Sequence, residues 1–414
     1  MTRDDLIYAL TLAAELEHSL CCQYLFSAYS MKKDPEEGLT WQQISMVRDW
    51  QSTILLIGRQ EMEHMGLVNN LLTAIGGAPH FRRPNFPQPA SAYGIPIASR
   101  LQAFSLVALD RFIEFEQPDE LPAVDAGAFR VPTPPKYESI QELYGKIHHA
   151  FKTIPERELF IGPPSAQVDS AAIGLVNDKR AYDVVLFPVT NRSSALKAIE
   201  LIVLEGEGVP IAKGVDPKSH YARLLDIREQ YIAEVEKHPD FVPARPVIDN
   251  PLTREDHREA VGGNLITDPF SLNVAHAFNT AYEALLFALI RFYARTDETD
   301  DELQGLQQTA FFPLMVMALR PLAEVLTTLP AGDAYEGKTA GPSFEFYRSI
   351  QYLPHKHSAW IVLHEKLLEM HTRLARLAEA RPEITRLAFI RDNFERIAMN
   401  FARYMNLADA EGGR

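Results

Sequence analysis

The sequence predicts a mostly α-helical protein in two halves, and three observations support this fold class. Apolar residues recur at helical spacing through the first eighty residues. The apolar segment 183–191 contains Pro188, which favours an extended connection over a sheet strand. The stretch 239–269 is rich in proline and glycine and separates two helical regions, as the boundary between two domains does.

The first two predicted helices, 4–30 and 40–75, form an antiparallel pair. In the first helix the positions at helical spacing include Leu6, Leu10, Ala13, Leu20, Tyr24 and Leu25. Thr40 is a good N-cap for the second helix, which stops where Gly76 and Gly77 follow. A short polar loop joins the two helices, and short connections place consecutive helices antiparallel.

Proline-rich loops separate the later elements. After the loop at 79–99 we expect helices at 100–116, 138–152, 193–206 and 219–237. In the second half we expect helices at 270–294, 303–328 with a proline break, 343–377 and 382–405. The predicted organisation is therefore a helical bundle at 1–238, a connection at 239–269 and a helical domain at 270–414.

The composition excludes several classes of protein. The chain has 414 residues, with 41 Lys and Arg against 55 Asp and Glu, for a formal net charge of −14. Nucleic acid is not an expected partner, because phosphate binding needs a surplus of basic residues. The adjacent Cys21 and Cys22 point about 100° apart on a helix, so no disulfide joins them. Without a signal peptide or an uninterrupted apolar stretch of about 20 residues, we expect a soluble cytoplasmic protein and no membrane partner.

The clearest sign of chemistry is a Glu-x-x-His pattern at Glu61 and His64. Residues three apart share a helix face, so both side chains can reach a common point. Glu61 also lies within the apolar stripe of its helix, one and two turns from Ile57 and Ile54. A carboxylate in an apolar stripe is costly unless it is paired or neutralised, and a metal ion removes that cost.

Glu17 repeats this situation on the first helix, among Leu10, Ala13 and Leu20. One helix that supplies Glu and a neighbour that supplies Glu-x-x-His make up half of a dinuclear carboxylate site. The alternative is a buried Glu–His hydrogen-bond network without metal. That alternative leaves two acids facing one pocket with few protons, which is unfavourable.

A second half of the site needs further acids and a histidine. Glu142 and Glu207 are candidates, and His220 follows Glu207 across a loop. Glu142 lies in the first turn of its helix and Glu207 at the end of the next, so antiparallel packing would place both at one level. Glu116 fits an apolar stripe better and is the alternative to Glu142.

Two further features in the sequence have structural interpretations. Tyr24 and Tyr144 lie one or two turns from proposed ligands and are expected to pack in the core. Glu283 lies on an apolar helix face in the second half, where we expect an ion pair with Arg291 or Arg320.

Six segments within residues 1–235 occur in the order and at the approximate spacing of a known family. They are AAELEHSLCCQYL, RQEMEHMGLVNNLLTAIGGAP, FIEFEQP, SIQELYGKI, IVLEGEG and SHYARLLDI. Together they resemble the ferritin-like domain of the iminophenyl-pyruvate dimer synthases of violacein- and rebeccamycin-type indole pathways. The segment ALRPLAEVLTTLPAG at 318–332 resembles the continuation of that family.

The resemblance implies a ferritin-like helical bundle with a metal centre, followed by a second helical region. Carried over by position, the implied ligands are Glu17, Glu61, His64, Glu142, Glu207 and His220. It also implies a dinuclear oxidoreductase that holds two iron ions, or manganese, and uses dioxygen or peroxide on a small amine- or imine-bearing metabolite. A homodimer is compatible with the size of the chain. The alternatives are a metal-binding protein without turnover and a helical scaffold.

Overall fold

The structure is a computed structural model and describes residues 1–118, 137, 139–170, 185–206, 218–257, 262–295, 297–347 and 355–411. Of these, the side chains of residue 91 and residues 406–411 are not described. The predicted mostly-α class is confirmed, because the described sheet is a single parallel pair of two-residue strands. The described 3₁₀ turns are Pro35–Glu37, Ala90–Ala92, Pro164–Ala166 and Glu255–His257.

The chain divides into two compact units. Unit 1 comprises Met1–Pro164 and Leu186–Arg245, and unit 2 comprises Ser165–Val185 and Pro246–Arg414. The change of unit after Arg245 falls inside the stretch 239–269 that the sequence analysis describes as a connection. The inclusion of Ser165–Val185 in unit 2 has no counterpart in the predicted organisation.

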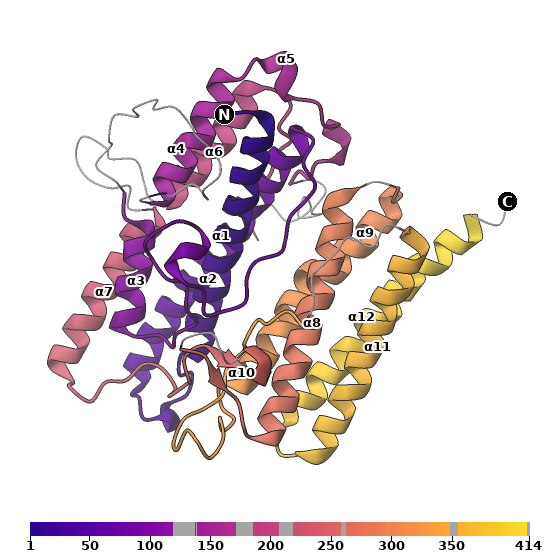
Figure 1. Cartoon of the computed structure of the whole chain (residues 1–414). Helices are drawn as coiled ribbons and strands as arrows, with labels where there is room; N and C mark the ends of the chain where they lie inside the picture. The colour runs from indigo at the N-terminus through magenta and orange to yellow at the C-terminus, as the bar shows by residue number, and fades with distance from the viewer. Residues whose placement is uncertain are drawn as a thin grey trace. The chain divides into compact units, whose positions relative to one another are not determined.

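Unit 1 is built on two long helices, α1 (Arg3–Ser30) and α2 (Trp41–Ala74), which run side by side (Figure 1). Each of them begins with a capping box. The hydroxyl of Thr2 or Thr40 accepts a hydrogen bond from the backbone N–H of the third helical residue, and the side chain of that residue accepts one from the threonine backbone N–H. Helix α2 ends before Gly76, which takes a φ of +88° that favours glycine.

Five further helices belong to the described part of unit 1, and the ends of four of them position the candidate site. They are α3 (Leu106–Glu116), α4 (Ile140–Thr153), α5 (Glu156–Leu159), α6 (Arg192–Gly206) and α7 (His220–Lys237). Helix α3 packs on α7 and α4 packs on α6, while α1 contacts α4 and α2 contacts α6 and α7. The last turns of α3 and α6 and the first turns of α4 and α7 meet beside α1 and α2.

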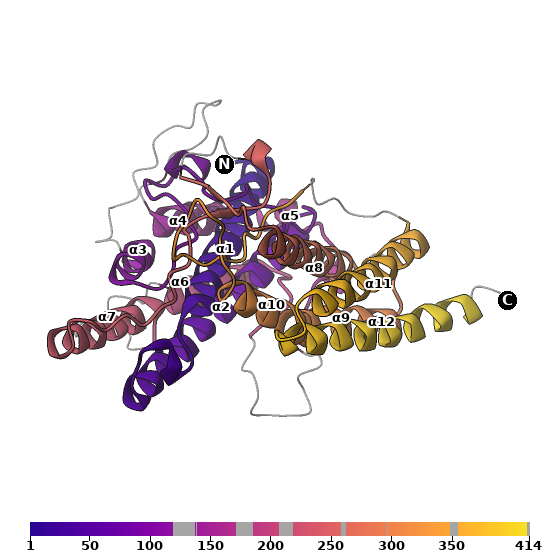
Figure 2. The same ribbon diagram turned by 90° about the horizontal axis from the view of Figure 1, so that it is seen from below.

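Unit 2 is a second group of packed helices. It contains α8 (Pro269–Ala294), α9 (Asp300–Thr309), the π-helix η6 (Ala310–Leu319), α10 (Arg320–Leu326), α11 (Lys356–Ala380) and α12 (Thr385–Glu411). Helices α11 and α12 lie side by side in both views (Figures 1 and 2), and α11 also packs on α8. The short strands β1 (Pro251–Leu252) and β2 (Asn264–Leu265) precede α8.

The helix predicted at 343–377 is wrong in its first part, because α11 begins only at Lys356. Residues 343–347 are non-helical, and their polar groups bond to other segments of unit 2. Glu345 accepts hydrogen bonds from the backbone and hydroxyl of Thr253, and the Tyr347 N–H donates to Glu283. These tertiary partners replace the bonds that a helix would make within itself.

One described helical segment, Asp300–Leu326, is long and apolar enough to cross a membrane by length and composition. Sixty-one per cent of its most apolar window is buried inside the structure, as in the core helix of a compact unit.

Candidate metal centre

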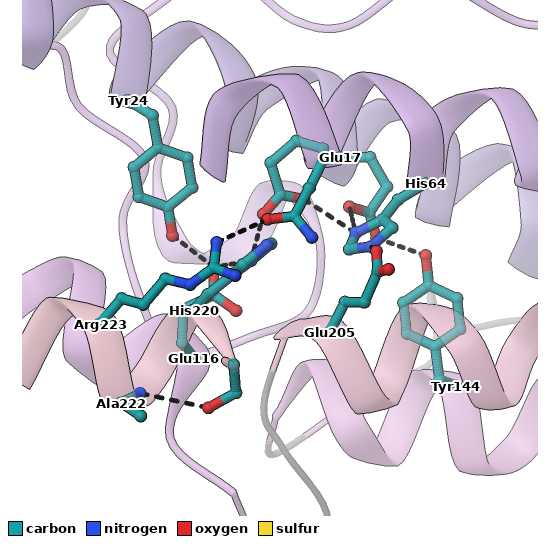
Figure 3. A network of polar contacts seen from close by, with 12 residues as sticks. Glu17, Tyr24, His64, Glu116, Tyr144, Glu205, His220, Ala222 and Arg223 are labelled. Atoms are coloured by element: carbon teal, nitrogen blue, oxygen red, sulfur yellow. Dashed lines mark hydrogen bonds and ion pairs between the residues drawn. The ribbon is translucent and has the colours of Figure 1, made fainter. Parts of the chain in front are cut away.

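Five side chains of unit 1 form two groups that share one residue. Glu17, Glu61 and His64 form one group, and Glu61, Glu116 and His220 form the other. Within each group, one ligand atom per residue lies within 4.8 Å of the others. All five residues are at most 4% exposed. Figure 3 labels four of them, Glu17, His64, Glu116 and His220, whose side chains converge between the helices.

The local sequence explains how each side chain arrives there. Glu17 comes from the middle of α1, and Glu61 and His64 lie one turn apart on the same face of α2. Glu116 is the last residue of α3, and His220 is the first residue of α7. The helix ends therefore complete a site that the two long helices begin.

The imidazoles face the carboxylates at close range. His64 Nδ1 lies 3.4 Å from Glu61 Oε2 and 3.6 Å from Glu17 Oε2. His220 Nδ1 lies 2.9 Å from Glu61 Oε1 and 3.5 Å from Glu116 Oε1. The two rings are stacked, with centroids 5.5 Å apart. Glu61 thus uses one oxygen toward each histidine, which is the geometry of a bridging carboxylate.

Two buried tyrosines hold the outer carboxylates. The Tyr144 hydroxyl donates to Glu17 Oε1, and the Tyr24 hydroxyl donates to Glu116 Oε1. Tyr24 also packs edge-on against Phe112, at 4.7 Å between ring centroids. Both tyrosines lie in the core, as the sequence predicts, and each also orients one acid of the site.

Glu205 is a residue of the site that the sequence analysis missed. Its Oε2 lies 3.1 Å from His64 Nε2, on the opposite side of the ring from Glu17 and Glu61. A signal was available, because Glu205 lies one turn after Ile202, which lines the cavity beside the cluster. The residue of this LEGEG segment that the sequence analysis expects as a ligand is Glu207, two positions after Glu205.

The pKa values show how crowded the negative charge is. Burial and the nearby Glu61 charge raise the pKa of Glu17 to about 8. Burial lowers the pKa of His220, but the Glu116 and Glu61 charges outweigh it and raise this pKa to about 9. Burial also lowers the pKa of His64, but the hydrogen bonds of His64 to Glu17, Glu205 and Glu61 outweigh burial and raise this pKa well above the usual range.

Glu61 shows the opposite shift. Burial alone would raise its pKa, but the charge and hydrogen bond of His220 lower that pKa overall. With protein groups alone, protons on the two imidazoles and on Glu17 balance the cluster. A metal ion would take the place of those protons.

The residues present fit a dinuclear metal centre. Among the described residues, no Lys or Arg nitrogen lies within 4.0 Å of the carboxylates of Glu17, Glu61 or Glu116. The outer ring nitrogen of the fully buried His220, Nε2, has no hydrogen-bond partner among the described residues. Carboxylate and imidazole donors suit iron and manganese. The adjoining cavity of about 20 Å³ has room for little more than one water-sized species.

The structure brings together four of the six ligands proposed from the sequence, namely Glu17, Glu61, His64 and His220. It places Glu142 elsewhere, with a carboxylate oxygen 2.6 Å from Lys146 Nζ. Glu142 and Tyr144 are two positions apart and point to opposite sides of α4. Because Tyr144 points toward the cluster, Glu142 points away from it. Glu116, the alternative to Glu142, lies in the cluster, and Glu207 falls outside the described residues.

The sequence matches the ferritin-like family over residues 10–229, which is more than half of the chain and contains the whole cluster. The chain belongs to the ferritin-like family. The family resemblance expected from the sequence is thereby confirmed, and so is the ferritin-like fold. A crystal structure of a ferritin-like protein from Caulobacter vibrioides is similar, with a TM-score of 0.50 and 17% sequence identity. That similarity covers 83% of this chain and 99% of the Caulobacter chain.

Two curated relatives are named as enzymes. Dichlorochromopyrrolate synthase of Lentzea aerocolonigenes is 29% identical over 385 residues, covering 85% of this ferritin-like chain and 37% of the relative. The 2-imino-3-(indol-3-yl)propanoate dimerase of Chromobacterium violaceum is 28% identical over 359 residues, covering 82% and 34%. The chain therefore spans about a third of the length of these two relatives.

Proposed function

We propose that this chain is an oxidoreductase with a dinuclear metal centre, holding two iron ions or alternatively manganese. The observation that carries the proposal is the meeting of three buried carboxylates and two imidazoles without a Lys or Arg beside the carboxylates among the described residues. Buried acids in such number require a cation, and the donor set is the one that iron and manganese prefer.

In this proposal, Glu17, Glu61 and His64 hold one ion, and Glu61, Glu116 and His220 hold the other. Bound iron supplies one-electron redox chemistry toward dioxygen or peroxide. Glu142 and Glu207 are not among the ligands proposed here.

The chain's own residues do the remaining work. The apolar walls, which include Leu20, Ile140 and Ile202, keep bulk water from the cluster. Tyr144 and Tyr24 hold Glu17 and Glu116 through their hydroxyl groups, so each carboxylate keeps one orientation. Each hydroxyl also offers a proton at a fixed point beside a carboxylate.

The substrate we propose is a small molecule that bears an amine or imine derived from an amino acid. The names of the two enzyme relatives, a synthase and an imine dimerase, support this class. Joining two imine molecules by one carbon–carbon bond removes two hydrogen atoms from them. Their two electrons and two protons reduce dioxygen to hydrogen peroxide, or reduce hydrogen peroxide to two waters, so the reaction balances.

Elemental analysis of freshly purified protein tests the metal centre. Wild type should carry about two equivalents of iron or manganese, and Glu61→Gln should lose most of both because Glu61 contacts both histidines. Glu63→Gln is the matched control, because Glu63 lies on the same helix and is buried but contacts Arg59, 3.3 Å away. It should retain the metal.

Each other result has a defined meaning. One equivalent in wild type would show a mononuclear site and contradict the shared role of Glu61. A normally folded wild type that carries no metal and takes up none on addition would overturn the proposal. In that case the protonated imidazoles and Glu17 would form a polar network inside a helical scaffold.

A further inference from the structure

We infer that the two metal positions are unequal in affinity, that the Glu17–Glu61–His64 position fills first, and that Glu205 is the positioning residue responsible. This inference rests on the proposed dinuclear centre and adds to it an order of loading. Glu205 is not among the ligands expected from the sequence, and it belongs to neither of the two ligand groups.

His64 directs its two ring nitrogens to different partners. Its Nδ1 faces the ligand carboxylates, while its Nε2 lies 3.1 Å from Glu205 Oε2 in a hydrogen bond. A carboxylate on the outer nitrogen fixes the tautomer and the orientation of the ring and makes the inner nitrogen a stronger donor to metal. His64 is therefore preorganised for an ion on its Nδ1 side.

Glu205 is itself held in place. The Gln60 side chain hydrogen-bonds to Glu205, and Gln60 Oε1 accepts a hydrogen bond from Arg223 Nη1 at 3.0 Å. The series of contacts Arg223–Gln60–Glu205–His64 thus links α7, α2 and α6 beside the cluster. Figure 3 shows Arg223, Glu205 and His64 of this series. Gln60 is suited to this place because its amide can accept from Arg223 and donate to Glu205.

His220 differs from His64 at its outer nitrogen. Its Nδ1 faces Glu61 and Glu116, as the Nδ1 of His64 faces its own carboxylates. The outer ring nitrogen of His220, Nε2, however, has no hydrogen bond to any described residue. Among the described residues, the second position therefore has no outer carboxylate like the one that orients His64. The ion itself must then order the His220 ring.

Outer partners of this kind change metal affinity by about 10–100-fold when they are removed. We therefore expect the first position to bind at least about tenfold more tightly than the second. Glu205 is 23% exposed in its side chain, so its substitution should leave the fold intact.

Equilibrium dialysis of metal-free protein against Mn²⁺ alone, with the bound ion counted at each free concentration, tests the inference. Wild type should show two steps of one equivalent each. His64→Ala should remove the tighter step and His220→Ala the weaker one, which assigns each step to its position. Glu205→Gln should weaken the tighter step about tenfold and leave the weaker step unchanged, a selective effect that a general loosening of the fold would not give.

Glu200→Gln is the matched control. Glu200 lies on the same helix and its carboxylate is 3.7 Å from His148 Nε2, but its side chain is 69% exposed and outside the cluster. It should leave both steps unchanged. Gln60→Leu, which separates Glu205 from Arg223, should weaken the tighter step by a smaller factor, and circular dichroism should confirm that each variant is folded.

Several outcomes would overturn the inference while the metal centre stands. These are a single two-equivalent step in wild type, equal weakening of both steps in Glu205→Gln, or no change in that variant. Loss of a whole equivalent in Glu205→Gln would make Glu205 a ligand and also overturn its positioning role. If wild type binds no Mn²⁺ and no iron, the proposed function fails together with the inference.

Discussion

In unit 2, Glu283, Glu302 and Glu324 are each buried beside a basic residue of their own, whereas Glu17, Glu61 and Glu116 in unit 1 share two histidines. The Lys366 ammonium lies 3.4 Å from Glu283, and the Lys356 ammonium lies 3.2 Å from Glu302. Glu324 has two guanidinium partners, Arg320 and Arg386, each at 2.9 Å. The expectation that Glu283 pairs with Arg291 or Arg320 is therefore wrong, because its partner is Lys366.

The difference separates a structural acid from a candidate functional acid. A Lys or Arg is a permanent cation that cannot leave, so it satisfies one carboxylate for the lifetime of the fold. An imidazole can lose its proton and bind a metal instead, so acids that share imidazoles can exchange their cation. The contrast holds within α2 as well, because Glu63 pairs with Arg59 only two positions from Glu61.

The largest expected effect comes from removing the metal. An ion that binds the folded chain at a free concentration about a thousandfold above its dissociation constant stabilises it by about 4 kcal/mol. Chelation should therefore lower the melting temperature of unit 1 by about 10 °C. Hydrogen exchange followed by mass spectrometry should show loss of protection in α1 and α2 and no change in α8 and α11. Equal loss in both units, or none, would contradict the comparison.

An intermediate effect is expected when a permanent cation is removed from unit 2. Lys366→Met should destabilise the chain by about 2–3 kcal/mol, because it leaves the buried Glu283 charge without its ammonium partner. Glu283→Gln in the same chain should recover most of that loss. Urea unfolding measures both variants, and exposed Lys338→Met is the control. A cost below about 0.5 kcal/mol for Lys366→Met would show that the pair does not balance the charge.

The smallest effect concerns an acid of unit 1 that does have its own Arg. Glu37 accepts two hydrogen bonds from Arg245, at 2.6 and 3.0 Å. Burial raises the pKa of Glu37, but the bonds from Arg245 outweigh it and lower this pKa overall. A lowered folded-state pKa means that the stabilisation is complete above the unfolded value of about 4.3 and is lost as the pH falls through the folded value.

Glu37→Gln should therefore cost about 1 kcal/mol or less at pH 7, and the difference from wild type should vanish in acid. Urea unfolding at pH 7 and near pH 3 measures this, with the exposed neighbour changed in Glu36→Gln as control. If the difference in stability between wild type and Glu37→Gln grew on acidification, the pKa of Glu37 would not be lowered in the folded state, and its stabilisation by Arg245 would be refuted.

The sequence predicts features that depend on residues near in sequence better than features that depend on residues distant in sequence. Helices α1 and α2 were predicted within one residue at each end, because their stripes and caps are local signals. The start of α11 was misplaced because residues 343–347 bond to groups that are distant in sequence. No local pattern reports such partners.

The candidate site shows the same division. Glu17, Glu61 and His64 could be proposed from helical spacing, because they lie on two long, neighbouring helices. The choice between Glu142 and Glu116 could not be made in this way, because the packing of the shorter helices decides which end faces the cluster. The periodicity of α4 indicates that Tyr144 faces inward and Glu142 outward, but it does not place Glu116 at the cluster.

The sequence by itself determined that the chain is mostly helical and that Glu61 and His64 share one face of a helix, since periodicity and caps depend on near neighbours. The ferritin-like family was indicated by the resemblance of six ordered segments. Only the tertiary structure decided that Glu116 and not Glu142 lies in the cluster, that Tyr24 and Tyr144 hold its acids, and that Glu205 lies behind His64. The physical reason is that helix ends from different parts of the chain meet at one point. Which side chains they present depends on packing angles that no local pattern encodes.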